Sequence, residues 1–365
     1  MTSAWFKNFV LFVITVSVSI VCADFLVKFA LHIPSNYLPK IVYFNPALEP
    51  EKRLRPNLSL KAIGDMREFT FHVATDDRGF RKSWSNQDNT RPVVFLGDSQ
   101  TFGIGVQGEE TFAYRFGEAS GISTVNTGVP GYNNVEQLAL LRSEWANLQP
   151  QKVVLCFFAG NDAFENFKIA AQPDSEASVG AQPRKTFFSE VKNFLVKKSA
   201  LYQLLMRLRR FPAVNRLLQR FGLIEAQPPG ELVIFSSADT KKLRSFWQVT
   251  DHVLAQIQEE VRKHASELIV LFIPDRYQVD DAFWAAWRAK YQLAENEYDL
   301  TAPNRHIREF CLKNNIPFVD PTQALAQAHK KGEAPYWKID NHLSPQGHLI
   351  ISRVLEQHFS GKAAS

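Results

Sequence analysis

From residue 92 onwards, apolar runs alternate with stretches in which apolar side chains recur every three or four positions. Residues 92–96, 153–158 and 268–273 are short runs with no polar face. Such runs are typical of strands in a parallel sheet that helices cover on both faces. Two shorter segments, residues 123–126 and 317–319, complete five predicted strands. The pattern therefore predicts an α/β protein with a doubly wound parallel sheet.

The amphipathic stretches predict the connecting helices. One covers residues 109–119. The next has its apolar residues spaced by three, four and three positions, at Leu138, Leu141, Trp145 and Leu148. A crossover helix before the fourth strand is marked by Phe246, Val249, Val253, Ile257 and Val261. These spacings give each helix one apolar face, which is expected to pack on the sheet.

The N-terminus carries a different pattern. Residues 9–23 are almost purely apolar and follow Lys7, which favours a cytoplasmic N-terminus. The run is short for a membrane span of roughly 20 residues, but it can extend through residues 25–27 with Lys28 at its end. Residues 21–23 also resemble a signal peptidase site. Residues 1–30 are therefore predicted to be a signal anchor or a signal peptide.

Either interpretation exports the rest of the chain. An uncleaved segment would anchor the protein in the inner membrane, facing the periplasm or the cell exterior. Cleavage after Ala23 would release a secreted protein. The alternative is a buried N-terminal helix of a cytosolic protein.

Residues 31–90 are punctuated by Pro and Asn and are interpreted as an N-terminal extension laid against the main domain. The alternation at residues 68–74 predicts a strand, and residues 76–81 predict a turn. The main domain then covers residues 91–365. About 110 residues separate its third and fourth strands, which is far more than an ordinary crossover needs. A helical insertion is therefore predicted at about 163–240.

Charge is concentrated in this insertion. The chain of 365 residues has 42 Lys and Arg against 37 Asp and Glu. Residues 184–220 hold ten of the basic residues and one acid, Glu190, so the remainder is net acidic. This basic segment can meet lipid headgroups or an anionic polymer. The alternative is a solvated helical hairpin that packs its Leu side on the domain. The export signal argues against a nucleic-acid partner.

The apolar and charged fractions, 45% and 22%, are those of a globular protein. Three cysteines have neither metal-site spacing nor a disulfide framework. Cys156 and Cys311 are expected to pack in the core, and Cys22 lies in the N-terminal apolar run. The sequence thus points to a globular domain without a cysteine-based metal centre.

The first predicted strand of the main domain ends in Gly97-Asp98-Ser99, at the sheet edge where α/β proteins bind ligands. Three further loops leave the sheet on the same side, at residues 126–133, 159–162 and 339–348. Without the other loops, Asp98 and Ser99 are explained as well by helix capping as by a functional role. The other loops decide how these two residues are interpreted.

Acyl transfer needs a nucleophile, a base and donors for the negative charge that develops on the carbonyl oxygen. Ser99 is the candidate nucleophile and His342 the candidate base. Asp340, two residues earlier, would orient the imidazole and stabilise its charged form. The N–H groups of Ser99 and Gly131 and the side-chain amide of Asn161 are candidate donors of an oxyanion hole.

Each of these residues also has a purely structural interpretation. Gly131 suits a left-handed turn, Asn161 an ordinary loop, and His342 a surface loop. His348 competes with His342, but it falls inside the last predicted helix and is expected to serve packing. A zinc site built on Asp340, His342 and His348 lacks a further ligand cluster. The order of the residues on consecutive strand ends favours the serine interpretation.

These four blocks resemble the SGNH (GDSL-type) hydrolases. The matching blocks are Gly97-Asp98-Ser99, the glycine block at Gly131, Gly160-Asn161-Asp162, and the block that contains Asp340 and His342. The resemblance covers about 91–360 apart from the insertion. It implies a three-layer, flavodoxin-like α/β/α sandwich, Ser99 as nucleophile, an oxyanion hole from Ser99, Gly131 and Asn161, and no cofactor or metal.

One block departs from the usual pattern, because Asp340 and His342 are separated by one residue where the family usually has two. This spacing resembles the branch that includes alginate O-acetyltransferases. The expected function is an exported ester hydrolase that deacylates, for example deacetylates, an envelope or extracellular glycan or lipid. The alternatives are a polysaccharide O-acetyltransferase with the same triad, and a non-catalytic envelope scaffold.

Overall fold

The computed structural model describes residues 2–31, 37–64, 67–82, 91–170 and 228–361, with scattered positions between residues 199 and 220. The chain divides into two compact units. One joins residues 1–36 and 182–226. The other joins residues 37–181 and 227–365 and contains all the strands that the structure describes.

The larger unit is built on a five-stranded parallel sheet. Its strands are β5 (Val93–Leu96), β6 (Thr124–Asn126), β7 (Lys152–Phe158), β8 (Glu267–Ile273) and β9 (Phe318–Val319). Their spatial order is β6-β5-β7-β8-β9, which is the flavodoxin-like order. All five predicted strands and their parallel arrangement are confirmed.

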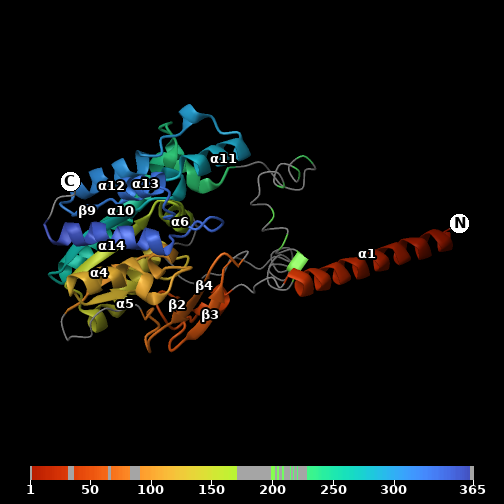
Figure 1. Cartoon of the computed structure of the whole chain (residues 1–365), viewed down its shortest axis with the longest axis horizontal. Helices are drawn as coiled ribbons and strands as arrows, with labels where there is room; N and C mark the ends of the chain where they lie inside the picture. Colours follow the sequence, from red (N-terminus) through yellow and green to blue (C-terminus); the bar gives the residue numbers. More distant parts are fainter. Residues whose placement is uncertain are drawn as a thin grey trace. The chain divides into compact units, whose positions relative to one another are not determined.

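Side chains of alternate residues in each strand point to opposite faces, and each face has its own apolar core. On one face, Val94, Val153 and Phe272 belong to the larger core, whereas Phe95, Cys156 and Leu271 belong to the core on the other face. The larger core includes residues of α5 (Asn134–Leu148), α6 (Asp162–Ala170), α10 (Lys241–Lys263) and α12 (Ala302–Lys313). The second core includes residues of α4 (Phe112–Ser120), α13 (Thr322–Lys330) and α14 (Pro345–Phe359), and α4 and α14 lie side by side (Figure 1). The three-layer sandwich explains why the strands have no polar face.

Shorter helices occupy the connections around this sandwich. They are α3 (Ser99–Phe102), η2 (Gly108–Glu110), η3 (Gly230–Phe235), η4 (Arg276–Gln278), α11 (Asp281–Tyr291) and η5 (Glu295–Glu297). The strand order reverses between β5 and β7, so α3 and α6 begin at the point where open α/β sheets bind ligands.

The N-terminal extension forms two antiparallel hairpins. Helix α2 (Leu38–Ile41) precedes a hairpin of β1 (Val42–Phe44) and β2 (Lys52–Leu54), and β3 (Ser59–Ile63) pairs with β4 (Thr70–Ala74). The predicted strand at residues 68–74 is confirmed as β4. Phe69, Phe71 and Val73 are buried in the larger core, so the extension packs against the sandwich, as expected.

Arg81 fastens the extension to the chain that follows the first strand of the sandwich. Its side chain is fully buried and donates hydrogen bonds to the carbonyl oxygens of Phe102, Gly103 and Val106. These carbonyls lie at the C-terminal end of α3 and just after it. Because a buried guanidinium is costly unless it is hydrogen-bonded, these contacts tie the extension to the segment at the end of α3.

Helix α1 (Thr2–Leu31) contains a candidate membrane span, Lys7–Phe29, which meets the requirement by length and composition. The span has 23 residues, longer than the apolar run in the sequence suggested. Within the same unit, the Asp24 carboxylate accepts hydrogen bonds from Ser199 Oγ at 2.6 Å and from the N–H of Leu201 at 2.9 Å. The basic segment 184–220 lies almost entirely outside the described residues, so its contact with lipid stays a prediction.

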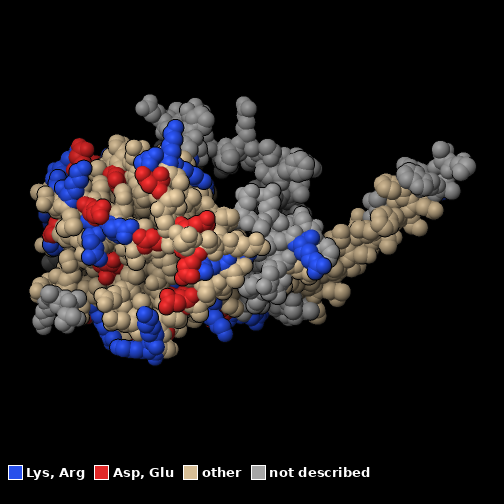
Figure 2. Space-filling model, turned by 90° about the horizontal axis from the view of Figure 1, so that it is seen from above, with Lys and Arg blue, Asp and Glu red and all other residues tan. Residues whose placement is uncertain are grey.

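The two ends of the predicted insertion belong to the sandwich. Helix α6 packs on α10, and η3 packs on both. Charges on the face seen in Figure 2 are mixed, with Lys and Arg interspersed among Asp and Glu. Cys156 and Cys311 are buried and free, which confirms their predicted packing role, and Cys22 is exposed on α1.

Candidate active site

Ser99 stands on the turn that joins β5 to α3. A Cβ atom on Gly97 would lie 2.1 Å from Thr101 Oγ1, so this position requires glycine. Asp98 is buried, and its carboxylate caps α3 by accepting a hydrogen bond from the N–H of Gln100 at 2.8 Å. Asp98 therefore holds the turn, as expected, and Ser99 is the first residue of the helix.

A hydrogen-bonded chain links the three predicted residues of the triad. His342 Nε2 lies 2.9 Å from Ser99 Oγ. On the other side of the ring, Nδ1 is hydrogen-bonded to Oδ1 of Asp340. The same Oδ1 accepts the backbone N–H of His342 at 2.9 Å. The one-residue separation is therefore sufficient, because the Asp340 carboxylate folds back over its own loop to reach the imidazole.

Gln100 holds this loop against α3, although no motif in the sequence pointed to it. Its side chain is 2% exposed, donates to the carbonyl oxygen of Asn341 at 3.2 Å and accepts from the N–H of Leu343 at 3.0 Å. Both backbone neighbours of His342 are thus tied to the residue that follows Ser99. Ser344 then caps α14 by accepting from the N–H groups of Gln346 and Gly347.

The extension supplies a second support that the sequence did not reveal. The Glu68 carboxylate accepts the N–H of Ile339 at 2.9 Å and that of Asp340 at 2.9 Å. The loop that carries Asp340 and His342 is therefore held between Glu68 and Gln100.

The candidate oxyanion donors are placed differently from one another. Asn161 follows β7 and lines the pocket next to Ser99, where its amide donates to Asp98 Oδ2 at 3.4 Å. Gly131 adopts φ 77°, and its carbonyl oxygen accepts from Lys52 Nζ at 2.6 Å. Gly131 is not among the described residues that line this pocket. The structure thus brings Asn161 to Ser99, and the donor role of Gly131 stays a prediction.

The pocket beside Ser99 has a volume of about 380 Å³. Ser99, His342 and Asn161 line it. Its lining also includes aromatic and acidic side chains, namely Phe158, Glu231, Asp275, Tyr277 and Trp287. This size falls within the range of small-molecule sites.

Buried carboxyl groups surround the turn. Burial raises the pKa of Asp98, and burial together with the nearby Asp98 raises that of Asp162 well above its ordinary value. Burial also raises the pKa of Asp275 to about 7. Removing a carboxylate from water raises the free energy of its charged form. These buried groups therefore favour the protonated form more than surface acids do.

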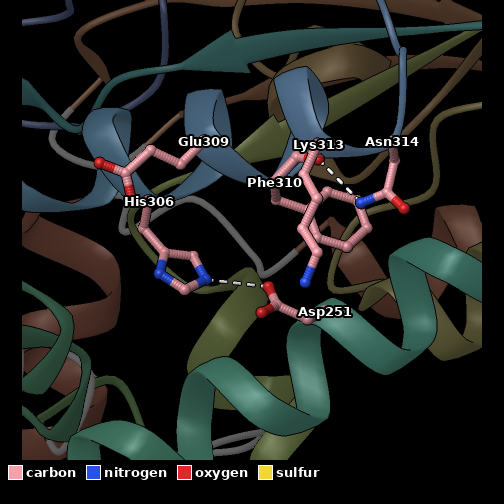
Figure 3. A pocket seen from close by; sticks show the side chains of 6 residues that line it. All are labelled: Asp251, His306, Glu309, Phe310, Lys313 and Asn314. Atoms are coloured by element: carbon pink, nitrogen blue, oxygen red, sulfur yellow. Dashed lines mark hydrogen bonds and ion pairs between the residues drawn. The ribbon is translucent and has the colours of Figure 1, made fainter.

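A second pocket lies between α10 and α12 (Figure 3). Asp251 Oδ1 and His306 Nε2 face each other there at 2.9 Å, and His306 stacks on Trp247 with ring centroids 4.0 Å apart. The described residues that line it include no Ser, Thr or Cys. This pair lacks a nucleophile, so the chemistry expected of Ser99 cannot take place here.

His348 is fully buried in α14, as its position in the sequence predicted. Its ring stacks on Phe112, and Nδ1 accepts the N–H of that residue at 3.1 Å. The ring is therefore part of the packing between α14 and α4. Among the described residues, no group of three His, Cys, Asp or Glu residues could hold a metal ion.

His348 is expected to make the protein less stable as the pH falls. Burial lowers its pKa to about 3, whereas an unfolded His has a pKa of about 6.5. Between these values the unfolded chain binds the extra proton, so this contribution to stability is lost as pH falls from 6.5 towards 3. Asp275 changes stability in the opposite direction, because its pKa is raised in the folded protein. The contribution of His348 is therefore isolated by comparing the wild type with His348→Asn. The free energy of unfolding, measured in urea, should fall less steeply over this range in His348→Asn than in the wild type. Parallel curves would contradict the assignment.

A sequence model of the GDSL-like lipase/acylhydrolase family matches residues 95–350. The chain belongs to this family. The family consists of ester-hydrolysing enzymes, and the matched region contains Ser99, Asp340 and His342 but not Glu68.

The chain is similar to several solved structures. The lipase/acylhydrolase from Enterococcus faecalis is 15% identical, with 75% of this chain and 97% of that chain covered and a TM-score of 0.39. A GDSL-like lipase from Bacteroides thetaiotaomicron is 14% identical, with 74% and 88% covered and a TM-score of 0.37. A catalytic mutant of an acetylxylan esterase from Geobacillus stearothermophilus is 13% identical, with 73% and 92% covered and a TM-score of 0.35. No curated protein matches the chain.

Proposed function

We propose that this protein is an exported, membrane-anchored serine esterase that deacylates a glycan or lipid of the bacterial cell envelope. The observation that carries the proposal is the chain of hydrogen bonds from Ser99 through His342 to Asp340. Helix α1 supports the anchor by its length and composition. The family supports the ester chemistry.

The proposed reaction has two halves. His342 Nε2 takes the proton of Ser99 while Oγ forms a bond to the acyl carbon, and the same proton then leaves with the alcohol as the ester bond breaks. Water then attacks the acyl carbon of the acyl-serine and gives a proton to His342. As the bond between the acyl carbon and Oγ breaks, His342 returns this proton to Oγ, which releases the acid and regenerates Ser99. Asp340 keeps Nδ1 protonated and stabilises the imidazolium that forms in both halves. The N–H of Ser99 and the amide of Asn161 are the proposed donors to the oxyanion.

Hydrolysis is tested by measuring both products from p-nitrophenyl acetate. The wild-type protein should release acetate and p-nitrophenolate in equal amounts, because water accepts the acyl group. No turnover by the folded protein would contradict the proposed function.

Polysaccharide O-acetyl transfer is a second candidate, favoured by the Asp340-Asn341-His342 spacing. A transferase would release p-nitrophenolate faster when an acceptor glycan is added, and the acetyl group would appear on the sugar. Equal rates and free acetate with each envelope glycan would count against transfer.

A further inference from the structure

The pocket beside Ser99 has a wall that takes no part in the proposed bond chemistry. Tyr277 in η4 and Trp287 in α11 form its aromatic portion, with ring centroids 5.7 Å apart and planes inclined at 56°. Phe158, at the end of β7, lines the same pocket. Tyr277 is buried, whereas Trp287 is half-buried and keeps part of its indole exposed.

Two acidic side chains accompany these rings. Glu231 is half-buried in η3. Asp275 is 5% exposed, and its Oδ2 faces the backbone of Gly160, where a Cβ atom would come within 2.6 Å. The described residues that line the pocket include no Lys or Arg. Lys290 lies over the Trp287 ring, with Nζ 5.4 Å from the centroid, but is not one of the lining residues.

Aromatic rings beside acidic side chains favour some classes of ligand over others. A sugar ring offers a flat set of C–H groups that pack on an aromatic face, and hydroxyl groups that donate to carboxylates. A phosphate or carboxylate group in the same place would be repelled by the Glu231 carboxylate, and no Lys or Arg among the described lining residues would offset this repulsion. A long acyl chain would leave these acids desolvated and without hydrogen-bond donors.

We propose that the wall formed by Glu231, Asp275, Tyr277 and Trp287 binds the neutral sugar ring that carries the ester. The substrate of this site is then an acylated neutral glycan, and neither a phospholipid nor a uronic acid polymer. This proposal rests on the proposed esterase function, because Ser99 and His342 line the same pocket.

Three acetyl esters separate the wall from the bond chemistry. Ethyl acetate has no ring to reach the wall, acetylated xylose is a neutral sugar, and acetylated glucuronic acid carries a carboxylate. Trp287→Ala should lower kcat/KM for acetylated xylose by about 10-fold more than it lowers kcat/KM for ethyl acetate. Trp247→Ala is the control, because Trp247 stacks on His306 and does not line the pocket. Glu231→Gln should reduce the preference for acetylated xylose over acetylated glucuronic acid.

Several results would overturn the proposal. Equal losses in the two Trp variants would do so, as would equal hydrolysis of the two sugar esters by the wild type. Faster hydrolysis of phosphatidylcholine vesicles than of acetylated xylose would assign the wall to a lipid. Failure of the wild type to hydrolyse even ethyl acetate would contradict the esterase function itself, and the subsite with it.

An independent observation carries a second inference. Glu68 lies in the extension, outside the region that matches the family. Its carboxylate nevertheless accepts the consecutive backbone N–H groups of Ile339 and Asp340. We infer that Glu68 is a positioning residue, which fixes Asp340 and through it His342. It is not among the described residues that line the pocket.

A positioning role predicts a loss confined to the chemical step. Glu68→Ala should lower kcat on p-nitrophenyl acetate by up to about 100-fold with KM unchanged, because a small misplacement of the base is costly. Glu68→Gln, whose amide oxygen can still accept these N–H groups, should recover part of the rate. Glu51→Ala, between β1 and β2 of the same extension, is the control. A wild-type kcat in Glu68→Ala, or no recovery in Glu68→Gln, would overturn the inference.

Discussion

Replacing Ser99 with Ala is expected to lower kcat on p-nitrophenyl acetate by about 10⁴-fold or more, leaving only the residual rate that substrate binding and the oxyanion donors supply. The reason is that Oγ is the atom that His342 Nε2 faces at 2.9 Å, and its removal leaves the base without a proton to take. Asp98, not Ser99, caps α3, so the turn should survive the change.

The thermal midpoint and the circular dichroism spectrum of Ser99→Ala should therefore match those of the wild type. Ser120→Ala is a matched control, because the Ser120 hydroxyl donates to the carbonyl oxygen of Phe116 at the end of α4. The control should keep the full rate. An active Ser99→Ala protein would show that another group performs the acyl transfer.

The second large effect is expected at Asp340. Asp340→Ala should lower kcat by about 10⁴-fold, the size of loss that follows removal of the acid from a serine triad. In this protein one oxygen, Oδ1, accepts both the Nδ1–H and the backbone N–H of His342. Ala removes both contacts, so the imidazole loses its orientation as well as its counter-charge.

Asp340→Asn tests this geometry more finely. The Asn Oδ1 can still accept from both groups, so the ring should keep its orientation and lose only the stabilising charge. We therefore expect kcat of Asp340→Asn to lie between those of the wild type and Asp340→Ala. Steady-state kinetics at one pH measure all three. Equal rates in Asn and Ala would show that orientation by Oδ1 contributes nothing.

The sandwich could be predicted from the sequence because its strands are buried on both faces. Such burial requires continuous apolar runs, and those at residues 153–158 and 268–273 are plain in the sequence. Ser99, His342 and Asp340 could be predicted for a similar reason. Parallel strands bring their carboxyl ends to one edge, so residues distant in sequence meet in the same place.

The supports of the site could not be predicted in this way. Glu68 and Gln100 bind backbone N–H and C=O groups of the loop around His342, and every residue type offers those groups. Their partners lie more than 200 positions away in the sequence, with no motif to connect them. Arg81 is similar, because a fully buried Arg that binds carbonyl oxygens looks like an ordinary surface cation in the sequence. The sequence offered one signal for Glu68, Gln100 and Arg81, because each is a charged or amide residue next to predicted core positions.

The nucleophile is tested most directly with a fluorophosphonate probe, which bonds covalently to an activated serine. Peptide mapping of the labelled wild-type protein should place one adduct on Ser99, and prior incubation with p-nitrophenyl acetate should slow the labelling. His342→Ala should label far more slowly, because Oγ then lacks the base that activates it. A wild-type protein that turns over the ester with Ser99 unlabelled, or with the adduct on another residue, would contradict the account.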